Sequence, residues 1–165
     1  MPGTATIART AIQDAIKAKL ESVAGIENVY TDYRRAADVS DFVERFRTQD
    51  TKYIHTWLIR RRTSDPHTSE SHKGQVTIGW AVHYYHTFPI EFFFAYQNET
   101  SEALFQSHID DVLNAFSNQR TLGGWNTERP LALLDTQQDY LGPVYGHKAL
   151  FTITVIDYQS GIIPQ

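Results

Sequence analysis

The stretch Gln75-Val-Thr-Ile-Gly-Trp-Ala-Val-His-Tyr-Tyr-His86 alternates in polarity. A period of two places successive side chains on opposite faces of a strand. Pro89 has no backbone N–H, so we expect it to interrupt the ladder, and Ile90–Tyr96 then resumes as a second apolar run. We therefore predict a long strand with one buried face, around which the rest of the chain is arranged. Its apolar side comprises Val76, Ile78, Trp80, Val82 and Tyr84.

Length and composition indicate one domain, residues 1–165, with ordinary globular character. The chain has 165 residues, of which 41% are hydrophobic and 21% charged, enough for a single sizeable core. A net charge of −4 gives no global attraction to nucleic acid. The absence of cysteine excludes disulfides and thiolate chemistry. No signal peptide and no membrane span is expected from the hydropathy pattern.

The flanking segments complete the predicted fold. Apolar residues recur at helical spacing in three segments, which are Thr4–Val23, Asp38–Thr48 and Ser101–Ser117. Further strands are predicted at Ile26–Tyr33, Tyr53–Arg62 and Lys148–Tyr158. Two segments lack such patterns: Thr63–Lys73 is predicted to be a polar loop, and Leu122–Leu134 to be a break followed by a short apolar run. The predicted class is α+β, with a mixed or antiparallel sheet of about four to five strands and the N-terminal and second amphipathic helices packed on one face.

The polar residues do not form a recognisable catalytic or metal site. His67 and His72 fall in the polar loop, while His83 and His86 are three apart on a strand and project to opposite faces. Asp110 and Asp111 are neighbours on a helix and point about 100° apart. We expect no metal, no cofactor and no enzymatic activity.

Two features are candidates for binding a partner. Arginines cluster at two predicted strand ends, and each cluster is either a solvated strand end or a basic patch for an acidic partner; they are Arg34, Arg35, Arg60, Arg61 and Arg62. Phe92, Phe93 and Phe94 place aromatic rings on both faces of one strand. Both faces must then be covered, one by the core and the other by a helix or another subunit.

The order of predicted elements resembles that of the tail terminator (tail completion) proteins of long-tailed bacteriophages. The resemblance rests on an N-terminal helix leading into a short strand, a long strand, an amphipathic helix and a closing strand. The corresponding segments are Ile7–Val23, Ile26–Tyr33, Val76–Tyr85, Ser101–Ser117 and Ala149–Tyr158. Three segments look like additions to that layout: Asp38–Thr48, Phe88–Tyr96 and Leu122–Leu134.

The resemblance implies a virion structural protein at the junction of tail and neck, assembled in the host cytoplasm. Such proteins form a homo-oligomeric ring, typically a hexamer, on the last ring of the tail tube protein. They end tube polymerisation and offer a surface to the head connector or neck protein, while DNA only passes through the lumen. No membrane is involved.

Two other interpretations remain open from the residues. The first is a small-molecule-binding, cone-shaped α+β domain, whose aromatic pocket would be lined by Trp57, Trp80, Tyr84 and Phe94. The second is an enzyme on the same scaffold, using His83 or His108 with Asp110 or Asp111. The mass in solution separates them, since a ring favours the terminator and a ligand-stabilised monomer or dimer favours a pocket.

Overall fold

The structure is a computed structural model that describes residues 4–32, 39–48, 54–60, 63–68, 79–96 and 99–162. The three helices are α1 (Thr4–Glu21), α2 (Val39–Phe46) and α3 (Ser101–Ser117). The strands are β1 (Val29–Tyr30), β2 (His55–Ile59), β3 (Thr63–Thr68), β4 (Gly79–Ala95), β5 (Thr121–Leu122), β6 (Trp125–Leu141) and β7 (Val144–Ile162). All three predicted helices are confirmed, with ends that differ by a few residues.

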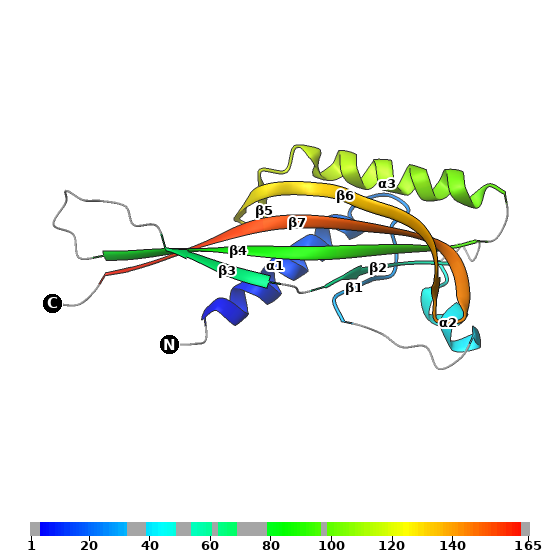
Figure 1. Ribbon diagram of the computed structural model, residues 1–165, viewed down its shortest axis with the longest axis horizontal. Coiled ribbons are helices and arrows are strands. Elements are labelled where there is room, and N and C mark those ends of the chain that lie inside the picture. The colour runs from blue at the N-terminus through cyan, green and yellow to red at the C-terminus, as the bar shows by residue number, and fades with distance from the viewer. Residues whose placement is uncertain are drawn as a thin grey trace.

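The predicted fold class is wrong, because the chain is mostly β. The strands of the described residues form one sheet of seven, in the order β1-β2-β4-β7-β6-β5, with β3 paired to β4. Only β1 and β2 are parallel; every other pair is antiparallel. Figure 1 shows β4 and β7 running the length of the sheet, which curls at the end near α2. At the opposite end these two strands extend beyond the helices.

Three strands escaped the prediction, the two-residue β5 and the longer β3 and β6, because their residues carry no apolar alternation. The predicted polar loop Thr63–Lys73 contains β3 over its first six residues, and residues 69–73 lie outside the described part of the chain. The predicted break at Leu122–Leu134 belongs mostly to β6, which is 17 residues long. β6 is a strand because it pairs with β7, and pairing between segments need not leave a local pattern.

Pro89 does not interrupt the long strand, contrary to the prediction. β4 continues through it, and Pro89 lies opposite Thr152 of β7. The Pro89 carbonyl faces the other flank, where it accepts a hydrogen bond from the Arg60 N–H at 2.8 Å. In an antiparallel strand the N and C=O of one residue point to the same side. The missing N–H therefore falls in the gap between β2 and β3 and costs no bond to β7.

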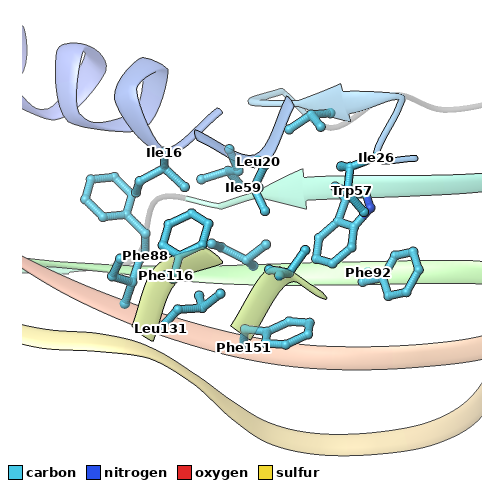
Figure 2. Packing of buried hydrophobic residues seen from close by; sticks show 14 of the residues in the cluster. Ile16, Leu20, Ile26, Trp57, Ile59, Phe88, Phe92, Phe116, Leu131 and Phe151 are labelled. Carbon is cyan, nitrogen blue, oxygen red and sulfur yellow. The ribbon is translucent and has the colours of Figure 1, made fainter. Parts of the chain in front are cut away.

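The main core lies between one face of the sheet and helices α1 and α3. The helices contribute the predicted stripes, which are Ile12, Ile16 and Leu20 from α1 and Phe105, Ile109, Val112 and Phe116 from α3. The sheet contributes alternate residues of β4 and β7. Trp57 stacks on Phe92 with ring centroids 4.0 Å apart, and Figure 2 shows the pair beside Phe151. Burial of this apolar surface is the main stabilising term for the fold.

A smaller cluster covers part of the other face of the sheet. Phe46 of α2 packs there with Phe93 and Ala95 of β4, and partly buried side chains of β1 and of the β6–β7 turn complete it. One short helix therefore closes this face near the curled end. The two clusters explain how consecutive residues of β4 are buried on opposite sides.

Candidate interaction surface

Of the five arginines predicted as a binding patch, the structure describes only Arg60. Its Nη2 atom lies 3.0 Å from Glu91 Oε2, and its side chain is 48% exposed. Lys148 Nζ lies 3.8 Å from the same Glu91 oxygen. Arg60 is therefore a surface cation held by a neighbouring carboxylate. Arg34, Arg35, Arg61 and Arg62 lie outside the described residues.

The three phenylalanines are all buried within the subunit. Phe92 and Phe94 belong to the main core, and Phe93 belongs to the smaller cluster beneath α2. This matches the expectation that both faces of the strand are covered at these residues. Of the two expected covers for the second face, a helix or another subunit, the structure shows the helix α2 next to Phe93. Whether these residues contribute to binding stays a prediction.

Of the four aromatic residues proposed to line a small-molecule pocket, the three whose side chains are described lie in two different parts of the sheet. Trp57 and Phe94 are fully buried in the core. Tyr84 lies farther along β4, where it stacks on His86 at a centroid distance of 6.2 Å, and the Trp80 side chain is outside the described residues. A pocket does exist on the opposite face, between α2, β1 and the β6–β7 turn. Its lining includes Tyr30, Phe46, Leu58, Phe93 and Tyr140, with Glu91 and Lys148 as charged groups.

Histidines gather beneath α3, although the sequence placed them far apart. His55 on β2 lies 5.4 Å from His108 on α3, centroid to centroid. His147 on β7 stacks on Phe105 at 5.1 Å, and its Nδ1 is 3.6 Å from Glu102 Oε2. Burial lowers the pKa of His108, and the Asp111 carboxylate opposes that shift. Within the described ranges, no three His, Cys, Asp or Glu side chains are arranged to hold a metal ion.

His108 is poorly placed to work as a base with the neighbouring carboxylates. Its ring is packed inward, against His55, Phe92 and Phe94. Asp110 and Asp111 are exposed on α3. A general base needs hydrogen-bond reach to a bound substrate, and this half-buried ring is packed against three other rings.

Among the described side chains, the most exposed large apolar residues include Leu134 and Tyr140 of β6, a strand that the sequence analysis missed. All seven residues from 132 to 138 are exposed. Because successive side chains of a strand alternate between faces, neither face of this stretch is covered. Leu134 is 58% exposed and is the extra residue of a bulge, since Leu133 pairs with Phe151 and Asp135 with Leu150. One signal pointed to this strand: the turn at Gly142-Pro143 before a clear strand is typical of a hairpin.

The outer edge of β6 is also open. Among the described strands, β6 pairs with β7 on one side and with β5 only at Trp125 and Asn126 on the other. From Asp135 to Leu141 the register with β7 is regular, so this stretch presents an ordered row of backbone donors and acceptors. Such an edge is a template for pairing with another chain. Tyr140, 66% exposed, stands at its end and packs on Tyr145 at 5.0 Å.

Comparison with known proteins leaves the family open. No known protein family matches the chain, and no curated protein matches it. Among solved structures, a chain of "Virion of native gene transfer agent (GTA) particle" is similar, with 12% sequence identity and a TM-score of 0.48. The alignment covers 90% of this chain and 97% of that chain. A likeness at this level carries no argument about function. None of the described helices has the length and apolar character needed to cross a membrane.

Proposed function

We propose that this chain is a virion structural protein of the tail terminator type, which assembles into a ring on the end of a phage tail tube. The observation that carries the proposal is the exposure of strand β6. Its residues 132–138 are covered on neither face. A long strand with two leucines and an open edge is costly to leave in water and invites aggregation unless a partner covers it. The role consists of binding, and no catalytic step belongs to it.

The layout of the chain supports the same role. The helix, short strand, long strand, helix and closing strand on which the resemblance rests correspond to α1, β1, β4, α3 and β7. The additions in that comparison form α2, the C-terminal part of β4 and much of β6. Partners in the proposed role are further copies of the chain, the tail tube protein and the connector, at the tail–neck junction of the virion.

Electron microscopy of the purified chain, alone and mixed with tail tubes of the same phage, tests the proposal. We expect rings on tube ends, and tubes that no longer lengthen when more tube protein is added. Sizing by sedimentation should show a species of several subunits in the presence of tubes. A chain that stays a single subunit under both conditions and leaves tube growth unchanged would overturn the proposed function.

A further inference from the structure

Three exposed tyrosines lie side by side at the curled end of the sheet. Tyr140 of β6 and Tyr145 of β7 are Cα partners, so their side chains point to the same face, and their ring centroids are 5.0 Å apart. Tyr96 directly follows β4, and its N–H donates to the Tyr145 carbonyl at 3.1 Å. The three residues are therefore neighbours across adjacent strands, with exposed fractions of 51% for Tyr96, 66% for Tyr140 and 42% for Tyr145. We call them the tyrosine surface.

Contacts within the subunit hold these rings in place. The Tyr145 hydroxyl donates to Gln138 Oε1 at 2.7 Å. The Tyr96 ring lies 5.9 Å from His147, centroid to centroid, and His147 is buried against Phe105 of α3. Figure 1 shows α3 beginning at this end of the sheet, so the tyrosine surface starts where the helix stops covering the sheet. Because the rings are already ordered, binding costs them little conformational entropy.

The charged side chains that border the tyrosine surface are acidic. Glu99 and Glu102 follow Tyr96 closely in the chain and are both exposed; Glu102 Oε2 lies 3.6 Å from Nδ1 of His147. The sequence has no lysine or arginine from residue 92 to residue 119. Lys148 of β7 alternates to the opposite face, where carboxylate oxygens lie 3.8 and 3.6 Å from its Nζ atom. Within the described residues, this border therefore carries a net negative charge.

Exposed aromatic rings beside carboxylates suit a planar cation. An arginine guanidinium stacks on aromatic rings and also binds carboxylates through paired N–H groups, whereas a lysine ammonium is a compact point charge. Carboxylates repel the phosphates of a nucleic acid. A small molecule would need a concave site that encloses most of its surface, but of the three tyrosines only Tyr140 lines the pocket described above, which lies on the opposite face. The remaining occupant is a protein segment with an arginine side chain.

We infer that the tyrosine surface binds an arginine side chain carried by an extended segment of a partner protein. The guanidinium stacks on the exposed rings, and the Glu102 carboxylate pairs with it on the side of α3. Adjacent strands are about 4.8 Å apart, so Tyr96 and Tyr140 are separated by about 10 Å, which is the length of roughly three extended residues. A short segment therefore spans the whole surface. The inference goes beyond the proposed function, because it requires neither a ring nor residues 132–138 of β6.

An NMR titration of the isotope-labelled chain tests this inference with the probe peptide acetyl-Gly-Arg-Gly-amide. We expect the largest amide shifts at Tyr96, Glu102 and Tyr145. Replacing the arginine of the peptide by citrulline, which has the same shape without the charge, should abolish these shifts. Replacing it by lysine should weaken binding about two- to five-fold, which is the share of stacking on an exposed ring.

Two variants with matched controls locate the binding site. Tyr140→Ala and Glu102→Gln should each weaken binding of the arginine peptide about two- to five-fold. Tyr158→Ala removes another exposed tyrosine, on β7, and Glu128→Gln removes another exposed carboxylate, on β6; both should bind the peptide like the parent. Circular dichroism should be unchanged in all four variants, because each substituted side chain is exposed.

Three outcomes would overturn the inference. Equal shifts with the citrulline peptide would show that the charge is not recognised, and parent-like binding by both Tyr140→Ala and Glu102→Gln would place the peptide elsewhere. If sedimentation shows that the parent associates with itself and Tyr140→Ala does not, a second copy is the occupant. The proposed function is judged separately: a chain that forms rings but ignores the peptide keeps that function and loses this inference, and a single subunit that binds the peptide does the reverse.

Discussion

His108 of α3 packs edge-on against His55 of β2, with the two ring centroids 5.4 Å apart. The His55 Nε2 atom accepts a hydrogen bond from the Glu27 N–H at 3.1 Å, so His55 is neutral in this arrangement. A Cβ added at Gly25 would lie 3.3 Å from His108 Cε1. The histidine pair therefore joins α3 and β2 to the loop that follows α1.

We expect this pair to make the fold acid-sensitive. Burial lowers the pKa of His108, against the opposing effect of Asp111, so the unfolded chain binds a proton more readily than the folded one. The contribution of the neutral His108 to the free energy of unfolding is fully present above the unfolded pKa of about 6.5. It falls as the pH drops through that value. The melting temperature should decrease from pH 7 to pH 5, and His108→Gln should flatten that decrease.

His86 supplies an independent comparison in the same experiment. Burial lowers its pKa too, Asp157 opposes the shift and Arg9 adds to it. His86→Gln should remove a separate part of the pH dependence, and the double variant should remove more than either single one. An unchanged slope in the double variant would contradict the assignment to these two side chains.

Asn28 should be the most sensitive polar residue of the loop after α1. It has a positive φ of 56°, and its Nδ2 donates to the carbonyls of Phe46 at 3.0 Å and His55 at 3.2 Å. Asn28→Ala loses these bonds and strains the backbone, at a cost of about 2–4 kcal/mol in the free energy of unfolding. Asn28→Gly keeps the backbone conformation and should cost less. Urea denaturation measures both, and equal losses would show that the positive φ of Asn28 contributes no strain in the alanine variant.

Gly146 should tolerate no side chain. A Cβ there would collide with the Phe94 carbonyl oxygen and lie 2.9 Å from Ala95 Cα, so β4 and β7 would have to separate. Gly146→Ala should lower the free energy of unfolding by about 1–3 kcal/mol. Thr136→Ala is the control, because Thr136 is an exposed residue of β6, the strand on the other side of β7. Thermal melts that rank the two variants in the opposite order would contradict the prediction.

Phe93 and Phe94 should report on different faces of the sheet when each is changed to alanine. Phe94 is fully buried beside His55 and His108, and its loss should cost about 3–5 kcal/mol in stability. Phe93 packs with Phe46 of α2 in the smaller cluster, so its loss should be smaller. Hydrogen exchange should speed up in α2 for Phe93→Ala and in α3 for Phe94→Ala. Faster exchange in the same helix for both variants would contradict the assignment of faces.

The sequence by itself determined the elements that bury one face. In α1 and β7 the buried residues can be recognised from the local sequence pattern. They form a helical stripe of Ile12, Ile16 and Leu20, and a strand alternation of Ala149, Phe151, Ile153 and Val155. Each pattern has the period of its own backbone, 3.6 or 2 residues, and needs no knowledge of the partner. α2 was predictable for the same reason, because its apolar residues recur at helical spacing in the sequence; they are Val39, Phe42, Val43 and Phe46.

Only the tertiary structure decided the fold class, the place of Pro89 and the candidate interface. β6 has no pattern to find, because residues 132–138 are covered on neither face and the strand exists through its hydrogen bonds to β7. Pro89 is accepted because its missing N–H falls between β2 and β3. His55 and His108 are 53 positions apart in the chain and meet only when α3 packs on the sheet. Pairing and packing between distant segments depend on where the whole chain places each edge and face, and local periodicity does not encode that.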